Sequence, residues 1–246
     1  MPRISPRLRC RAPQPAKGKR GGAERIAGFR TGAILKHAFP SYTRLERIAD
    51  GCVHAVSVIF SLAAAALLLI GAIGLPAAIF IGLIVYSIGL IGMFGASAAY
   101  NLVSHVGVKE ILRRLDHASI FVMIAGSYTP FALVVGGTAG YTLLGAVWAI
   151  AALGVVIKLR FPRRFDRLSV VLYLAQGWMV LVALDSIIAA LPSRALTLLV
   201  AGGIVYTLGV PFHLMERLRF HNVIWHIFVL GGAACQFIAI REAVMG

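Results

Sequence analysis

The sequence predicts an all-α protein folded as a bundle of seven transmembrane helices. Of its 246 residues, 59% are hydrophobic and only 13% are charged, and the mean hydropathy is +0.87. A soluble domain carries about 25% charged residues. The hydrophobic residues also form runs close to the length of about 20 residues that crosses the hydrocarbon core of a bilayer. An isolated strand cannot satisfy its backbone hydrogen bonds in lipid, so we expect every run to be a helix.

Seven such runs follow one another along the chain, and each is expected to form one span: Gly51–Ile73, Ala77–Val103, Asp116–Val135, Tyr141–Ile157, Leu168–Ala190, Ala195–Phe212 and Val223–Ile240. Three of the connections are too short to hold a further domain: Gly74–Pro76, Gly136–Gly140 and Leu191–Arg194. Small residues within the spans, such as Gly95 and Gly231, favour close packing of the helices. The sequence therefore predicts one membrane domain, residues 42–246.

The distribution of positive charge predicts the orientation of this domain. Of 24 lysines and arginines, 12 precede the first span and 10 lie in alternate connections, which leaves only Arg194 and Arg241 for the opposite side. By the positive-inside rule, the N-terminus is cytoplasmic and the C-terminus is outside. We therefore expect a multi-pass protein of the cell inner membrane. The net charge of +15 follows from the same distribution, so we favour contact with anionic lipid over nucleic-acid binding.

The first 41 residues differ in character from the rest of the chain. They are rich in arginine, proline and glycine and lack apolar periodicity. Such a segment buries too little apolar surface to offset the entropy of ordering it. We expect residues 1–41 to be a disordered basic tail, although a start codon assigned too far upstream would give the same pattern. The segment Tyr42–Asp50 is interpreted as a short helix that leads into the first span or lies along the interface.

Polar residues gather near one end of several predicted spans. Ser97 and Asn101 lie at the end of the second span, Asn222 and His226 lie at the start of the seventh, and Asp116 opens the third. Residues four apart share one face of a helix, so each pair points in one direction. Polar groups within a membrane are costly, and several at one depth indicate a functional site. The alternative interpretation is that these residues serve only the membrane interface.

A second polar stripe enters the first span from the same side. Glu46, Asp50 and His54 follow one another at intervals of four residues, so they share one helical face. We interpret His54 as a hydrogen-bonded packing residue rather than a metal ligand. Glu46 is interpreted as a helix cap or as the partner of a basic loop residue. The stripe adds a fourth span to the predicted polar layer.

Three strings of residues carry a resemblance to a known family. They are SAAYN at Ser97–Asn101, RRLDHASIFVMIAGSYTPF at Arg113–Phe131 and HNVIWHIFVL at His221–Leu230. They resemble the hemolysin III family, which is related to the progestin and adipoQ (adiponectin) receptors. The resemblance extends from Glu46 to the C-terminus. It implies seven helices, a cytoplasmic N-terminus and an intramembrane zinc site near the cytoplasmic face.

The resemblance also implies which residues form that site. Ser97, Asp116 and His226 match the family pattern, whereas Asn101 and Asn222 stand where the family usually has histidine. Carried over by position, the expected Zn²⁺ ligands are Asn101, Asn222 and His226, and the expected catalytic residues are Ser97 and Asp116. An amide oxygen is a weak donor for Zn²⁺, which prefers imidazole or thiolate. The two asparagines therefore make the implied zinc site poorer than a site with three histidines.

Two classes of function follow from these residues. If Zn²⁺ binds, the implied chemistry is water activation for hydrolysis of a lipid amide or ester, with Asp116 as proton acceptor. If no metal binds, the same side chains form a hydrogen-bond network in a non-enzymatic protein that binds lipid or contributes to membrane homeostasis. A pore-forming cytolysin fits less well, because a folded multi-span protein is not built to leave one cell and enter another. The expected partner is a membrane lipid and not a nucleic acid, and the sequence identifies no protein partner.

Overall fold

The computed structural model describes residues 42–161 and 163–246, and these residues form seven helical spans without any strand. The first four spans are α2 (Arg44–Gly71), α3 (Ala77–Leu102), α4 (Val106–Val135) and α5 (Gly137–Arg160). The fifth consists of α6 (Asp166–Gly177), the 3-10 helix η1 (Met179–Ala183) and α7 (Leu184–Ala190). The last two are α8 (Ser193–Leu214) and α9 (His221–Met245).

The predicted class, an all-α bundle of seven spans, is therefore confirmed for the described residues. Each of the seven helical segments is long and apolar enough to cross a membrane. The orientation across the membrane stays a prediction from the charge distribution. The predicted basic tail, residues 1–41, lies outside the described residues.

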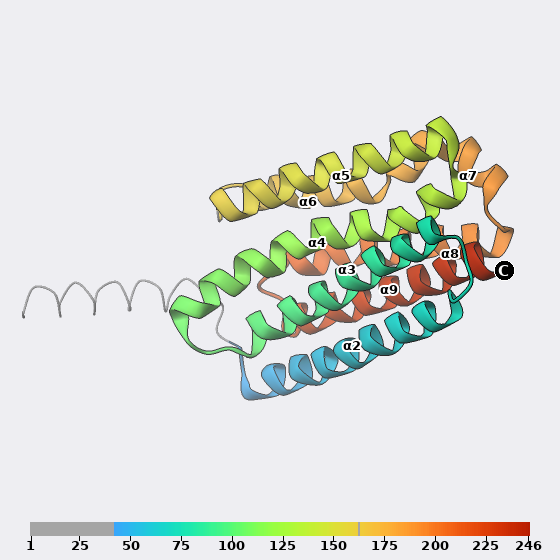
Figure 1. Cartoon of the computed structure of the whole chain (residues 1–246). Coiled ribbons are helices and arrows are strands. Elements are labelled where there is room, and N and C mark those ends of the chain that lie inside the picture. Colours follow the sequence, from blue (N-terminus) through green and yellow to red (C-terminus); the bar gives the residue numbers. More distant parts are fainter. Residues whose placement is uncertain (1–41, 162) are drawn as a thin grey trace, which may run out of the picture. The chain divides into compact units, whose positions relative to one another are not determined.

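The helices form a bundle in which the first and last spans meet. Figure 1 shows the long helices side by side, with α2 at one edge of the view and α5 and α6 at the opposite edge. Consecutive helices pack together from α2 to α5, and α8 packs on α9. Helix α9 also contacts α2 and α4. This arrangement brings the start of α2 next to the start of α9, although the two segments are far apart in the sequence.

Apolar side chains fill the bundle and also cover much of its outside. Leu83, Tyr86 and Phe121 are fully buried, whereas Ile59 and Leu67 are more than half exposed. Exposed apolar residues on long helices are what a bundle surrounded by hydrocarbon requires, because lipid tails are as apolar as leucine. Within the bundle, a Cβ atom at Gly154 of α5 would overlap the ring of Phe121 on α4. Glycine at position 154 therefore permits the close approach of these two helices.

Two helices begin earlier than the apolar runs suggested. Helix α4 begins at Val106, so Asp116 lies inside the helix rather than at its start. The intervening residues, Lys109–Leu115, are too charged to count as an apolar run, but they continue the same helix. Likewise, α2 is continuous from Arg44 and begins with a capping box at Thr43 and Glu46. Hydropathy measures the part of a helix that lies in hydrocarbon, and both helices extend beyond that part.

The fifth span is interrupted near its middle. Helix α6 ends at Gly177, and the chain continues through η1 before α7 begins. The hydroxyl of Tyr128 on α4 donates to the carbonyl of Gly177 at 2.6 Å and accepts from the backbone N–H of Val180 at 2.9 Å. Backbone groups released inside a membrane must find partners within the protein. Tyr128 supplies a partner to both of these groups.

Candidate metal site

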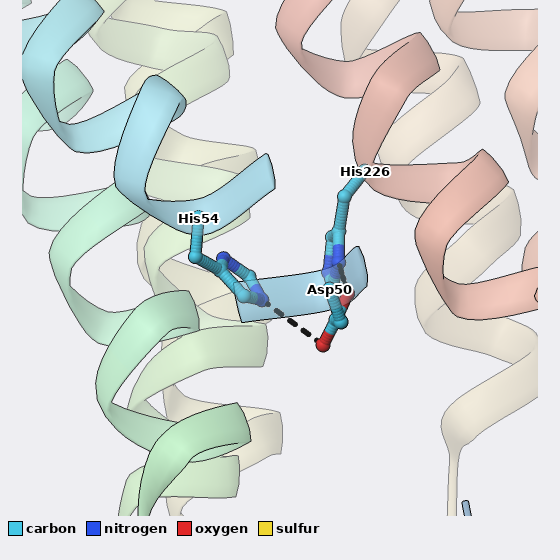
Figure 2. A group of neighbouring side chains, drawn as sticks. All are labelled: Asp50, His54 and His226. Carbon is cyan, nitrogen blue, oxygen red and sulfur yellow. Dashed lines mark hydrogen bonds and ion pairs between the residues drawn. The ribbon is translucent and has the colours of Figure 1, made fainter. Parts of the chain in front are cut away.

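Three titratable side chains meet where α2 and α9 begin. Asp50 and His54 lie one turn apart on α2, so both face α9, and His226 lies in the second turn of α9. One ligand atom from each residue lies within 4.8 Å of those from the other two. All three residues are buried, with His54 only 2% exposed. Figure 2 shows the three side chains converging between the two helices. We call them the Asp-His-His cluster.

Asp50 lies between the two imidazoles of this cluster. Its Oδ1 is 2.8 Å from Nδ1 of His226, and its Oδ2 is 3.3 Å from Nε2 of His54. The first contact is a hydrogen bond, whereas the second lacks hydrogen-bond geometry, and His54 Nε2 has no hydrogen-bond partner among the described residues. The two imidazole rings are 4.4 Å apart between centroids. Two imidazoles and one carboxylate therefore face one small region.

The predicted site residues on α3 and α9 surround this cluster. The hydroxyl oxygen of Ser97 is 3.5 Å from Nε2 of His226. Asn222 Nδ2 donates to Oδ2 of Asp50 at 3.1 Å and to Oδ1 of Asn101 at 3.3 Å. The side-chain nitrogen Nδ2 of Asn101 in turn donates to the backbone carbonyl of Ser97 at 3.0 Å. A continuous chain of amide contacts thus leads from α3 to the Asp50 carboxylate.

Helix α4 contributes the carboxylate of Asp116. This side chain is 14% exposed and lies beside the Ser97 hydroxyl, with His54, Arg113 and Asp50 nearby. One of its oxygens is 3.7 Å from Nδ1 of His117. Spans one, two, three and seven therefore bring polar side chains to one layer, as the sequence predicted.

The edge of this layer is formed by Tyr42 and His221. Their rings are 5.9 Å apart between centroids, and His221 is 6% exposed. Burial raises the pKa of the Tyr42 phenol above its usual value, so the hydroxyl stays protonated. Neither ring nitrogen of His221 has a hydrogen-bond partner among the described residues.

The structure groups His226 with two residues that the sequence did not assign as ligands. His54 was interpreted as a packing residue, and Asp50 was recognised only as part of a stripe. The signal in the sequence was their spacing of four residues, but their proximity to His226 depends on the contact between α2 and α9. Asn101 and Asn222 lie beside the cluster and bond to each other. Their assignment as ligands stays a prediction.

The donors of the Asp-His-His cluster fit a metal ion. Imidazole nitrogen and carboxylate oxygen are both common zinc ligands, and two histidines with one carboxylate occur in catalytic zinc sites that keep a fourth position open. Nδ1 of His226 is engaged by Asp50, so Nε2, which lies 3.5 Å from the Ser97 hydroxyl, is the ring nitrogen that could bind a metal ion. The same set of donors also suits non-haem iron, so the residues alone do not select the metal. The cluster is therefore a group that could bind a metal ion.

Fold and site together define the class: an all-helical, seven-span membrane protein with a buried cluster of potential metal ligands at one end of the bundle. Residues 43–237 match the family model described as "Haemolysin-III related". The chain therefore belongs to the haemolysin III family, and the resemblance seen in its three strings is confirmed.

Individual relatives agree with this assignment. The "Hemolysin-3 homolog" of Bacillus subtilis (strain 168) is 36% identical over 201 residues, which cover 81% of this chain and 94% of that protein. The "Hemolysin-3" of Bacillus cereus is 36% identical over 203 residues, covering 81% of this chain and 92% of that protein. The "Monocyte to macrophage differentiation factor" of Homo sapiens is 27% identical over 164 residues, covering 63% of this chain and 67% of that protein.

Proposed function

We propose that this protein is a zinc-dependent membrane hydrolase that cleaves an amide or ester bond of a membrane lipid. The observation that carries the proposal is the convergence of Asp50, His54 and His226, with their ligand atoms within 4.8 Å of one another. These three residues would hold the ion. A bound Zn²⁺ supplies a Lewis acid that activates water and polarises a carbonyl oxygen.

Residues next to the cluster have side chains suited to the remaining steps. The Asp116 carboxylate is the proton acceptor in this proposal, because it lies beside Ser97 and is not held by a salt bridge to a lysine or arginine among the described residues. Ser97, whose hydroxyl is 3.5 Å from His226, orients the reacting group. Asn222 holds the Asp50 carboxylate toward the histidines through its 3.1 Å hydrogen bond. The roles of Ser97 and Asn222 rest on these two contacts.

The location of these side chains supports the proposal of a lipid substrate. Asp50, Asp116 and His226 all belong to helical segments that are apolar enough to cross a membrane. The bundle also exposes large apolar side chains, including Ile48 and Val56 on α2, the helix that carries Asp50 and His54. A membrane lipid whose acyl chain lies along this apolar surface would place its amide or ester bond near the ends of the spans. Amide and ester linkages of lipids are the bonds at that depth.

A second candidate is a non-enzymatic protein that binds lipid or contributes to membrane homeostasis. It is favoured by the chain of amide contacts from Asn101 through Asn222 to Asp50, because this network provides hydrogen-bond partners without a metal. The names of the two Bacillus relatives suggest a cytolysin. For this chain we favour a function inside its own membrane, since seven apolar spans are costly to move through water.

The proposal is tested on the full chain, purified in detergent without chelators. We expect about one equivalent of Zn²⁺ per chain by elemental mass spectrometry, the stoichiometry of a single site. The loaded protein is then added to vesicles that contain either an N-acylsphingosine or a diacylglycerophospholipid, and released fatty acid is measured. Asp116→Asn is expected to keep the zinc and to reduce release by about 100-fold or more, as loss of a general base does.

The matched control is His105→Gln, which changes an exposed histidine at the start of α4 and should alter neither measurement. Wild-type protein that retains almost no zinc would contradict the proposed metal site. Zinc-loaded protein that releases no fatty acid from either vesicle would favour the lipid-binding candidate instead.

A further inference from the structure

The Glu46 side chain joins the beginnings of α2 and α9. Its Oε2 accepts from the backbone N–H of Thr43 at 2.8 Å and from the Thr43 hydroxyl at 2.7 Å. Its Oε1 accepts from the backbone N–H of Phe220 at 3.0 Å. The contacts with Thr43 belong to the capping box of α2. The contact with Phe220 crosses to another helix, 174 residues away in the sequence.

Phe220 is an unusual place for such a contact. It is the residue directly before α9, and its φ of 60° lies in the left-handed region. That conformation is unfavourable for a residue with a Cβ atom, so the surroundings must hold it. The Phe220 carbonyl accepts the first backbone bond of the helix, from Ile224 at 3.0 Å. Glu46 therefore bonds to the residue that sets where α9 begins and in which direction it runs.

The same two helices carry all three members of the Asp-His-His cluster. Asp50 lies one turn of α2 after Glu46, and His54 lies two turns after it, so the three side chains share a face. Asp50 bonds to Asn222 and His226 on α9, and Glu46 bonds to Phe220 just before it. Two carboxylates one turn apart thus span the same pair of helices. On α9 and the residue before it, Glu46 bonds to the backbone of Phe220, whereas Asp50 bonds to the side chains of Asn222 and His226.

We infer that Glu46 is a positioning residue for the metal site, which it serves by fixing the start of α9 against the start of α2. The inference rests on the proposed function, since it takes the Asp-His-His cluster as the metal site. Glu46 itself bonds to Thr43 and Phe220, not to the cluster. Its effect passes through the position of His226 relative to Asp50 and His54.

Glu46→Gln tests this role. A glutamine offers one acceptor oxygen where the carboxylate offers two, while three donors, two from Thr43 and one from Phe220, point at this side chain. We expect zinc affinity, measured by competition with a chromogenic chelator, to fall by about 10- to 100-fold, the range for residues that orient ligands. We also expect the visible absorption spectrum of the Co²⁺-substituted protein to change, because the ligand geometry changes.

Thr43→Val is the matched control, because it removes the capping hydroxyl and leaves the carboxylate free to reach Phe220. Thr43→Val should lower thermal stability as Glu46→Gln does. It should keep zinc affinity within about twofold, because the Thr43 hydroxyl takes no part in the Glu46–Phe220 contact that leads to α9. All measurements use the monodisperse fraction. If Glu46→Gln gives no monodisperse protein, Glu46→Asp is used instead. The shorter aspartate side chain cannot reach Thr43 and Phe220 at the same time.

Equal losses of zinc affinity in the glutamate and threonine variants would overturn the inference, because capping alone would then explain the effect. Unchanged affinity and spectrum in Glu46→Gln would also overturn it. Neither result touches the proposed function as long as the wild-type protein binds zinc. Absence of zinc from the wild-type protein would instead remove the proposed metal site itself.

Discussion

Two polar regions of this bundle differ in what their side chains bond to. In the first, the Asp-His-His cluster, side chains face other side chains: Asp50 lies 2.8 Å from His226 and 3.3 Å from His54. In the second, which we call the span-five cluster (Tyr128, Gln176, Gly177 and Val180), side chains bond to backbone. The hydroxyl of Tyr128 contacts the backbone of Gly177 and Val180, and Gln176 Nε2 donates to two carbonyls at 3.1 Å.

The difference separates a candidate site from a structural device. The backbone contacts of Tyr128 compensate for the interruption between α6 and α7, so this residue has a reason to be polar that needs no ligand. No interrupted helix explains the contacts within the Asp-His-His cluster, because α2 and α9 are continuous helices there. A buried atom without a hydrogen-bond partner among the described residues does not separate the two regions, because His54 Nε2 and Gln176 Oε1 both lack one. Burial alone would not have distinguished the two regions, since both are buried.

The largest effect is expected when a carboxylate of the Asp-His-His cluster is exchanged for an amide, with a carboxylate outside both regions as the control. Asp50→Asn should reduce zinc affinity by about 100-fold or more, because an amide oxygen is a poor zinc ligand. Asp166→Asn should leave zinc affinity within about twofold, since the partners of Asp166 are Lys158 at 2.7 Å and Arg113 at 3.6 Å, neither of which belongs to the cluster. Affinity is measured by chelator competition on both purified variants. Equal effects on zinc would mean that the cluster is not the metal site.

Much of the fold could be predicted from the sequence because hydropathy reports directly on membrane spans. The seven spans are confirmed for the described residues, and the family resemblance is confirmed by the matching family model. The structure also brings the predicted site residues Ser97 and His226 within 3.5 Å of each other. The helix α4 was expected to begin at Asp116, and its charged first turns were missed because they lie in no apolar run. The interruption after Gly177 was missed as well, because the sequence of span five is apolar across it.

The composition of the candidate site was harder to predict than its position. Asp50 and His226 are 176 residues apart, and their contact exists because the first and last spans pack together. No local pattern encodes that packing. The assignment of Asn101 and Asn222 as ligands came from family positions, where the usual residue is histidine. The structure offers Asp50 and His54 as stronger donors a few ångströms away, which a comparison by position alone does not reveal.

A smaller effect is expected from Tyr128→Phe, which tests the span-five cluster. The variant removes two hydrogen bonds to backbone, at 2.6 and 2.9 Å, and leaves the ring in place. Hydrogen bonds within membrane bundles contribute about 0.6 kcal/mol on average, so we expect a loss of about 1 to 2 kcal/mol. This corresponds to a fall of about 3 to 6 °C in the midpoint of thermal unfolding in detergent.

Zinc affinity should not change in the Tyr128 variant, which gives the opposite pattern to Asp50→Asn. Loss of zinc together with stability would show that the two regions are coupled and that the comparison fails. Phe60→Leu is a control for lost stability without a lost hydrogen bond, because the Phe60 ring contacts the rings of Phe94 and Phe237 and carries no hydroxyl.

The two asparagines are expected to affect zinc affinity less than Asp50 does, and the order of their effects distinguishes ligands from supporting residues. Asn222 bonds directly to Asp50 at 3.1 Å, whereas Asn101 reaches the cluster only through Asn222 at 3.3 Å. If both amides support the carboxylate, Asn222→Leu should weaken zinc binding by about tenfold and Asn101→Leu by only about threefold, since the effect fades with each bond from the ion. If instead both amides are ligands, as family position implies, each variant should lose as much affinity as the other. Chelator competition on the two variants decides between these interpretations, because leucine matches asparagine in size but offers no oxygen to either neighbour.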